Sequence, residues 1–269
     1  MSRSEGWVRK FFVERSDLFL KLMNSKWRLA PEEARLISRL LEIHGVGRGA
    51  RLLEVGCGSG RIAINLARLG YSVVGIDVSP TYISEAVRRS REEGVQVEFL
   101  VGDARRVDEV VGARRFDAVL FYWTSVLGYY DEVTDFEILA RCRKVVEDGG
   151  KLLILQHANR DHLILAFSVR RVLESRHDLG DYVVVEESRL DLLSSRYVST
   201  WSFYRKEGNA LVLIDTLETS QRVYSIHELV SIARRAGWDL EKAYASIATL
   251  EEFTKPAYHP ALNLVFKTS

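Results

Sequence analysis

A short turn in the first half of the chain carries glycine at every second position, in the run Gly56–Gly60. Glycine permits positive φ angles and lets a ligand approach the backbone without a Cβ in the way. The turn leads from an apolar run into a predicted helix, whose first amide groups favour a negative group. Its spacing differs from the G-x-G-x-x-G turn of dinucleotide sites. The pattern indicates a ligand-binding turn of another kind, and tight packing without a ligand is the alternative.

Two acidic residues end the next two predicted strands. Asp77 closes the run Val73–Asp77, and its carboxylate offers two acceptor oxygens that match the two hydroxyls of a ribose. The alternative role for Asp77, capping the next helix, is better filled by Ser79. Asp103 closes the run Phe99–Asp103, where a carboxylate beside a free backbone N–H suits an adenine edge. A solvated loop carboxylate is the alternative for Asp103.

These groups are positioned by an alternation of short apolar runs and helical segments. The apolar runs are Leu52–Val55, Ser72–Ile76, Val95–Val101, Ala118–Phe121 and Lys151–Leu155. The helical segments are Arg61–Leu69, Thr81–Glu93 and Thr134–Val146, the last ended by Asp148-Gly149-Gly150. Apolar runs with little internal alternation are typical of parallel strands covered on both faces. The pattern predicts a doubly wound α/β sheet, whose carboxyl edge is where ligands bind.

The chain divides into four predicted parts. Residues 1–45 are predicted to form two amphipathic helices, and residues 46–160 to form the first part of the core. Residues 161–222 are predicted to be an insertion that contains a helix followed by three antiparallel strands. The strands lie between Asp181 and Ser220, and a turn at Glu207–Asn209 joins the second and third of them. Residues 223–269 return to the core with a helix at Ile226–Ala236 and strands near Leu240 and at Ala261–Phe266.

The composition excludes several classes of protein. The chain of 269 residues is 47% apolar and 28% charged, which is typical of an ordinary globular domain. A net charge of +1, from 38 basic and 37 acidic residues, disfavours binding to nucleic acid or membrane by bulk charge. Two distant cysteines exclude a disulfide framework and a zinc ribbon. The sequence shows neither a signal peptide nor an apolar stretch of membrane-spanning length, so we expect a cytoplasmic protein.

The three strand ends resemble those of the class I S-adenosylmethionine-dependent methyltransferases. The resemblance rests on Leu52–Arg61, Val73–Pro80 and Val101–Ala104, and it continues through Phe116–Phe121 and Asp148–Ile154. It covers about residues 48–157. It implies a Rossmann-like sheet of seven strands with an antiparallel last strand, decorated here by the inserted antiparallel β subdomain. It also implies S-adenosylmethionine as cofactor and S-adenosylhomocysteine as product.

The resemblance assigns roles to residues at the three strand ends. The glycine turn would hold the methionine part of the cofactor, with Glu54 orienting its amino group. Asp77 would bind the ribose, and Asp103 with Ala104 would read the adenine edge. The implied cofactor-binding set is Glu54, Gly56, Cys57, Gly58, Gly60, Asp77, Val78, Asp103, Ala104, Phe121 and Tyr122. Within this set we expect the Cys57 thiol to be a small packed group rather than a reactive one.

Departures from the patterns of subfamilies narrow the acceptor. The segment Phe121–Thr124 lacks the proline motif of enzymes that methylate exocyclic base nitrogens or glutamine amides. Neither Cys57 nor Cys142 is placed to act as the nucleophile of cytosine-C5 methylation. The Asp and Asn cluster of metal-dependent catechol enzymes is missing from the sequence, and His157 and His162 have no carboxylate partner at ligand spacing. We therefore expect no metal.

The acceptor pocket is expected at the same edge of the sheet. His157 is a candidate general base because the unperturbed pKa of histidine lies near neutrality, and a satisfied structural histidine is the alternative. The pocket candidates are Tyr129, Tyr130, His157, Asn159 and Arg160.

The insertion carries more aromatic residues than a solvent-facing sheet needs. They are Tyr182, Tyr197, Trp201, Phe203 and Tyr204. It can serve as a lid over the acceptor or as the interface of a homodimer. The sequence predicts an enzyme that methylates a small molecule. The alternatives are an RNA or protein methyltransferase, and a non-catalytic module that binds S-adenosylmethionine or a nucleotide.

Overall fold

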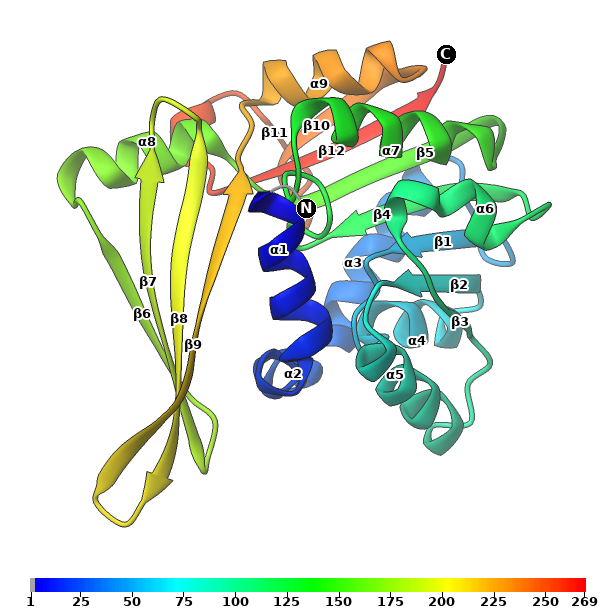
Figure 1. The fold of residues 1–269 in the computed structure, drawn as a ribbon. Helices are drawn as coiled ribbons and strands as arrows, with labels where there is room; N and C mark the ends of the chain where they lie inside the picture. The colour runs from blue at the N-terminus through cyan, green and yellow to red at the C-terminus, as the bar shows by residue number, and fades with distance from the viewer. Residues whose placement is uncertain (1–2) are drawn as a thin grey trace.

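The larger of two sheets holds eight strands, in a computed structural model that describes residues 3–269 (Figure 1). Its strands are β1 (Arg51–Val55), β2 (Ser72–Asp77), β3 (Glu98–Val101), β4 (Phe116–Tyr122), β5 (Val146–Ala158), β10 (Trp238–Ser246), β11 (Glu251–Glu252) and β12 (Ala261–Thr268). They lie in the order β11-β10-β12-β5-β4-β1-β2-β3. Strands β1 to β5 are parallel, and β12 lies antiparallel between β5 and β10. The doubly wound sheet and its antiparallel last strand are therefore confirmed.

Helices cover both faces of this sheet. The helices of the core are α3 (Ala30–Ile43), α4 (Arg61–Arg68), α5 (Pro80–Glu92), η3 (Ala104–Arg106), α6 (Val107–Val111), α7 (Glu132–Lys144), α9 (Ile226–Arg235) and η4 (Pro256–Tyr258). Neighbouring strand residues face opposite ways, so Leu52 packs in the cluster with α3 and α4, whereas Leu53 packs with α6, α7 and α9. Burial on both faces explains why the core strands are apolar without alternation.

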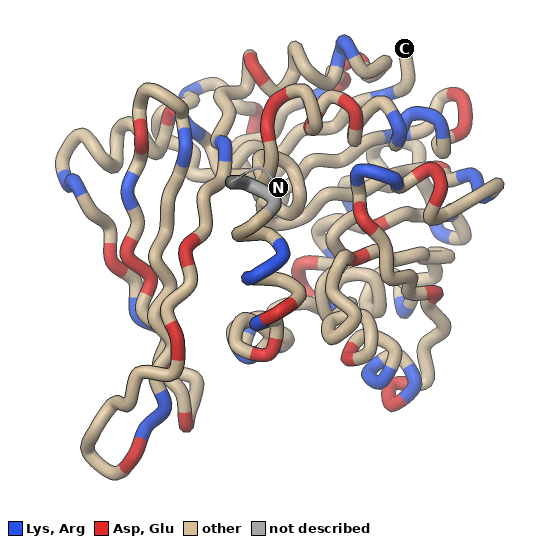
Figure 2. Tube along the Cα trace, viewed as in Figure 1, with Lys and Arg blue, Asp and Glu red and all other residues tan. Residues whose placement is uncertain are grey.

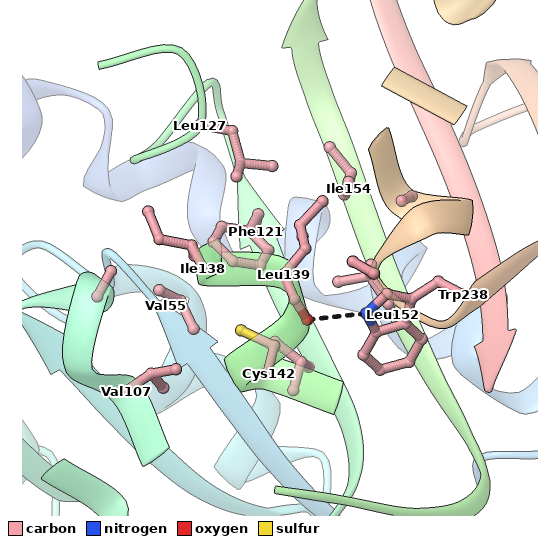
Figure 3. Close-up of a cluster of buried hydrophobic side chains, with 14 of the residues drawn as sticks. Val55, Val107, Phe121, Leu127, Ile138, Leu139, Cys142, Leu152, Ile154 and Trp238 are labelled. Carbon is pink, nitrogen blue, oxygen red and sulfur yellow. Dashed lines mark hydrogen bonds between the residues drawn. The ribbon is translucent and has the colours of Figure 1, made fainter. Parts of the chain in front are cut away.

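Figure 3 shows the cluster of buried side chains on the second of these faces. Ile138, Leu139 and Cys142 of α7 pack there against the strands. The Trp238 ring lies beside them, and its Nε1 donates a hydrogen bond of 3.0 Å to the Leu139 carbonyl (Figure 3). This bond satisfies the polar atom of a fully buried ring, and it ties the C-terminal part of the core to α7.

The smaller sheet is antiparallel and stands beside the core, with α1 and α2 between the two (Figure 1). It contains β6 (Leu173–Asp178), β7 (Tyr182–Asp191), β8 (Arg196–Glu207) and β9 (Ala210–Arg222), and it follows α8 (Arg160–Val169). The N-terminal elements are α1 (Arg3–Arg9), the π-helical turn η1 (Lys10–Glu14), α2 (Ser16–Ser25) and η2 (Trp27–Leu29). Phe11 and Leu18 from these elements pack against Val184, Phe203 and Leu217 of the smaller sheet.

The structure differs from the sequence predictions in five details. The N-terminal residues form α1, η1, α2, η2 and α3 rather than two helices. The core sheet has eight strands rather than seven, because the two-residue β11 pairs with β10. The smaller sheet has four strands rather than three, because β6 went unpredicted. Strand β3 begins at Glu98 rather than Val95. Helix α7 ends at Lys144, and the glycines predicted to end it lie within β5.

Charged residues are mixed rather than segregated. Figure 2 shows basic and acidic positions interspersed along both sheets and their helices. Many of them form pairs on single helices, such as Arg88 with Glu85 and Glu92. Among residues 3–269, no helix is both long and apolar enough to cross a membrane.

Candidate active site

A cavity of about 460 Å³ opens where the core, the N-terminal helices and the smaller sheet meet. The turns that follow β1, β2, β3 and β4 contribute one part of its wall. Helices α1 and α2 and the inner face of the smaller sheet contribute the rest. Predicted residues that line it are Glu54, Gly56, Cys57, Gly58, Asp77, Val78, Asp103, Ala104, Tyr122, Tyr129 and Tyr130. The carboxyl edge of the parallel strands is thus the place where the predicted groups meet.

The glycine turn between β1 and α4 requires glycine for two reasons. Gly56, Gly58 and Gly60 have φ angles of 76°, 55° and 79°, which side chains with a Cβ rarely adopt. A Cβ on Gly56 would stand 2.9 Å from the Ser125 Cβ, and one on Gly58 would stand 3.2 Å from the Met23 sulfur. The backbone of the turn is therefore closely approached both by the loop after β4 and by α2.

Glu54, at the end of β1, is a buried carboxyl group that lines the cavity. Its Oε2 atom has no hydrogen-bond partner among the described residues. Burial raises the pKa of this carboxyl to about 8, although the nearby Arg61 guanidinium opposes the shift. Arg61 is itself paired with Glu33 and lies over the Tyr122 ring, 5.3 Å from its centroid. Glu54 thus presents an unsatisfied acceptor to whatever occupies the cavity.

Asp77, at the end of β2, is held by backbone groups on both of its oxygens. Oδ2 accepts a hydrogen bond of 2.9 Å from the Gly58 N–H, and Oδ1 accepts one of 2.9 Å from the Ser79 N–H. Burial raises the pKa of Asp77 to about 6, and these two backbone bonds limit the rise. Each carboxylate oxygen has two lone pairs, so each retains an acceptor site for a ligand. Ser79 caps α5 through its own side chain, which leaves Asp77 free of that role.

Asp103, after β3, is half-buried and ion-paired. Its carboxylate accepts a hydrogen bond of 2.9 Å from the Arg105 N–H and pairs with the Arg105 guanidinium at 2.7 Å. Burial alone would raise the pKa of Asp103, and the Arg105 contacts outweigh it and lower the pKa below its ordinary value. The carboxylate is therefore charged and fixed beside Ala104 at the cavity wall.

The loop after β4 holds three non-glycine residues in left-handed backbone conformations. Trp123, Thr124 and Val126 have φ angles of 63°, 52° and 66°. This conformation is strained for a β-branched residue such as Val126, and strain of this kind gathers at functional sites. The Thr124 hydroxyl accepts a hydrogen bond of 2.9 Å from the Ala158 N–H, and the Ser125 hydroxyl contacts the Val55 carbonyl at 3.3 Å. These bonds hold the loop against the glycine turn.

Two predicted cofactor residues do not line the cavity. Gly60 is the N-cap residue before α4, and a Cβ there would stand 2.7 Å from the Phe99 ring, so glycine is needed there for its positive φ and for packing. Phe121 points into the core cluster beneath the sheet, because neighbouring strand residues face opposite ways (Figure 3). Tyr122, the next residue, does line the cavity.

Three predicted pocket residues also lie away from the cavity. His157 lies in β5, opposite Leu262 of β12; its ring stacks on Tyr224, and burial lowers its pKa to about 4. The Asn159 amide donates to the carbonyls of Pro256 and His259 and so anchors the start of α8. Arg160 pairs with Glu228 at 2.7 Å. The contacts of Asn159 and Arg160 hold the start of α8 to the core.

The cavity wall contains many side chains that sequence reasoning did not select. From the N-terminal helices they are Val8, Phe11, Phe12, Phe19, Leu22, Met23 and Lys26. From α8 and the smaller sheet they are Leu163, Ser175, His177, Glu186, Tyr197, Ser199, Trp201, Thr219 and Gln221. The alternation of side chains along β8 could have identified some of these residues, because it places Tyr197 and Trp201 on the face that lines the cavity.

Comparisons with known proteins agree with this geometry. A family model described as a methyltransferase domain matches residues 52–150. A ubiquinone biosynthesis O-methyltransferase from Xanthomonas axonopodis pv. citri is 32% identical over 181 residues, which is 62% of this chain and 70% of that protein. Other proteins of that name match over 56% to 70% of their length.

Solved structures share the fold at lower identity. An S-adenosylmethionine-dependent methyltransferase from Clostridium acetobutylicum has a TM-score of 0.75 and 14% identity, over 95% of this chain and 98% of that one. The CcbJ methyltransferase from Streptomyces caelestis has a TM-score of 0.73 and 20% identity, over 89% of each chain. With the sheet order, the three strand ends and these matches in hand, the chain belongs to the class I S-adenosylmethionine-dependent methyltransferases.

Proposed function

We propose that this methyltransferase acts on a small-molecule acceptor, which binds between the strand ends of the core and the inner face of the smaller sheet. The main observation that supports this proposal is that residues of both regions line one cavity. Its wall beyond the glycine turn is mostly apolar and contains many aromatic side chains, with Phe12 stacked on Tyr129 at 5.2 Å between ring centroids. Concave, mostly apolar sites with a few polar groups are typical of small-molecule binding. The interspersed charges of Figure 2 favour this class over RNA.

The residues of the core fit S-adenosylmethionine. The buried Glu54 oxygen without a partner suits the cofactor's amino group, and the glycine turn leaves room for the methionine part. The spare acceptor sites of Asp77 suit the ribose hydroxyls, and Asp103 with Ala104 and Val78 suits the adenine. Cys57 completes the wall as a thiol, because burial raises its pKa well above the ordinary value. We assign no metal to the site.

The chain itself contributes position and the exclusion of water. S-adenosylmethionine supplies a methyl group that its sulfonium sulfur already activates. Aromatic side chains of η1 and α2 close the cavity beside the glycine turn, which removes water from the reacting groups. Burial raises the pKa of the Tyr122 and Tyr129 hydroxyls, so both stay protonated and can only donate to an acceptor or accept from it as neutral groups.

Cofactor binding is the first test. Calorimetry should show that the protein binds S-adenosylhomocysteine at micromolar concentration and does not bind NAD. NAD binding of equal strength would overturn the assignment of the core residues.

Methyl transfer is the second test. Release of S-adenosylhomocysteine from S-adenosylmethionine should depend on an added small molecule, in a panel that also contains transfer RNA and a protein extract. Transfer to RNA or protein alone would support one of those acceptors, and binding without transfer to any would support a non-catalytic module.

The same geometry supports assignments for the parts of the chain. We assign residues 46–160 and 223–269, together with α3, to the cofactor-binding core, and the N-terminal elements before α3 and residues 161–222 to the cover over the acceptor. The inner face of the smaller sheet lines the cavity, which favours a lid over a homodimer interface. Two buried cysteines without a disulfide favour a reducing, cytoplasmic location.

A further inference from the structure

The inner face of the smaller sheet carries a polar cluster beside two aromatic side chains, Tyr197 and Trp201. Glu186 of β7 is its centre, and its Oε1 accepts hydrogen bonds from Ser199 at 2.8 Å and Ser188 at 3.0 Å. Its Oε2 accepts one from Ser175 at 3.3 Å. Ser175 also contacts the His177 Nε2 at 3.3 Å. Glu186, Ser175, Ser199 and His177 all line the cavity, so the cluster faces the space that the acceptor would occupy.

Three serine hydroxyls fix the Glu186 carboxylate without neutralising it. Among residues 3–269, no lysine or arginine forms an ion pair with Glu186, whereas Glu33, Glu85 and Glu228 each have an arginine partner. His177 does not supply the missing charge near pH 7, because burial and the nearby Lys26 lower its pKa by more than Glu186 raises it. A carboxylate can accept about four hydrogen bonds, so Glu186 keeps acceptor capacity for a ligand.

Aromatic rings stand beside this charge. Trp201 is paired with Glu186 across β7 and β8, and its ring lies 5.5 Å from Phe19 and 5.9 Å from Phe11. Tyr197 lines the cavity from the same face of β8. The faces of aromatic rings attract cations, and a carboxylate placed among them strengthens that preference. A purely structural cluster would need only the serine pair, because an uncompensated carboxylate is costly in a partly buried position.

We propose that Glu186 binds a positively charged amino group of the acceptor, so that the acceptors of this methyltransferase are amines. This inference rests on the proposed function, since it assigns the substrate class of that same cavity. Ser175, Ser188 and Ser199 hold the carboxylate in place, and the rings of Trp201 and Tyr197 flank the bound cation.

Three probes of matched shape test the proposal: benzylamine, benzyl alcohol and benzoate. Each is titrated into the full-length protein that has first been saturated with S-adenosylhomocysteine. Benzylamine should bind at least about tenfold more tightly than benzyl alcohol, because it gains a charge-assisted hydrogen bond. Benzoate should bind most weakly, because its charge repels that of Glu186. Failure of benzylamine to bind, or to bind more tightly than the alcohol, overturns the proposal.

Glu186→Gln isolates the charge while keeping the size of the side chain. Benzylamine affinity should fall about tenfold, and the affinities for benzyl alcohol and S-adenosylhomocysteine should stay within twofold. The matched control is Glu187→Gln, since Glu187 is exposed and faces away from the cavity on the same strand. An unchanged preference for benzylamine in Glu186→Gln overturns the proposal even if wild type shows the preference.

Failure of the proposed function has a different signature. A protein that does not bind S-adenosylhomocysteine refutes the cofactor assignment before any amine is added. A protein that binds S-adenosylhomocysteine but shows no preference for benzylamine refutes only the role of Glu186. Retained thermal stability of Glu186→Gln separates loss of the charge from loss of the fold.

Discussion

The two halves of the cavity are built in different ways. In the core half, the functional groups lie at or just after the ends of strands, and backbone atoms help to fix them, as the Gly58 N–H fixes Asp77. In the cover half, side chains project from strands and helices that are far apart in the sequence, as Phe11 and Trp201 do. Backbone geometry therefore sets the core half, whereas side-chain identity sets the cover half.

This difference indicates which parts of the molecule can tolerate changes of sequence. A turn such as Gly56–Gly60 depends on φ angles and close approaches that only glycine permits, so few sequences can form it. A strand such as β8 keeps its ladder whatever its side chains are, so its inner face can change with the acceptor. The cofactor half should respond to substitution through cofactor affinity alone, and the cover half through the acceptor alone.

Asp77→Ala should produce the largest effect that is confined to one half of the cavity, the cofactor half. It removes the acceptor sites proposed for two ribose hydroxyls, each bond being worth about 1.5–3 kcal/mol before water compensates. Affinity for S-adenosylhomocysteine should fall roughly 10- to 100-fold in calorimetry. The buried Gly58 and Ser79 N–H groups also lose their acceptor, so stability should fall by about 1–3 kcal/mol.

Asp148→Ala is the control for this variant, because Asp148 is an exposed carboxylate at the opposite end of the core strands. It should leave cofactor affinity unchanged. If Asp77→Ala also leaves it unchanged, Asp77 serves only the turn.

The same contrast explains what the sequence could predict. The strands of the core were predictable because burial on both faces makes them apolar runs, and their ends were predictable because the motifs are local. Tyr129 and Tyr130, which follow β4 at the ligand edge, line the cavity, and their role in an acceptor pocket stays a prediction. His157 lies near the end of β5, and Asn159 and Arg160 follow that strand, but the three side chains make contacts within the protein rather than lining the cavity. Position along the chain does not determine the face to which a side chain points.

Strand β6 shows why the cover half was harder to predict. Its inward residues include Ser175 and His177, and its outward residues include Glu174 and Arg176, so both faces are polar. Hydrophobic alternation vanishes when the inner face lines a polar part of a cavity rather than an apolar core. The polar side chains that line the cavity are therefore also the reason why β6 could not be predicted from the sequence.

Trp201→Ala should show the next largest effect, and only in the cover half. The variant removes an aromatic wall of the cavity, and aromatic contacts are worth about 0.5–1.5 kcal/mol beyond the area they bury. The KM for the best acceptor found in the transfer panel should rise up to about tenfold, with S-adenosylhomocysteine affinity within twofold of wild type. Thr200→Ala, on the other face of β8, is the control. A matching loss of cofactor affinity in Trp201→Ala would show that the two halves are coupled.

Glu54→Gln should change a pH dependence rather than a single affinity. The pKa of Glu54 in the free protein is about 8, and a bound ammonium group should lower it, so binding releases a proton. Affinity for S-adenosylhomocysteine should therefore rise about fivefold between pH 7 and pH 8, as the ionised fraction of Glu54 grows. The rise should be absent from Glu54→Gln in the same buffers.

The contribution of Glu54 to the stability of the free protein should fall with rising pH, whereas the affinity for S-adenosylhomocysteine rises. The raised pKa favours the folded state below the ordinary value of 4.5, and that contribution is lost as pH rises toward 8. An equal rise of affinity in wild type and Glu54→Gln would assign the titration to the cofactor and not to Glu54.

The smallest effect on activity is expected from His157→Leu. His157 lies outside the cavity wall, and its buried Nε2 has no partner among the described residues, so leucine removes an unsatisfied polar atom from an apolar site. Transfer should stay within twofold of wild type. The effect should appear in stability at low pH instead, because the folded pKa of about 4 lies below the ordinary 6.5. The unfolded chain then binds the proton more readily, and wild-type stability should fall by about 2 kcal/mol from pH 7 to pH 5 through this residue. Thermal denaturation at both pH values should show a smaller fall in the variant, whereas loss of transfer with stability retained would return His157 to the role of general base.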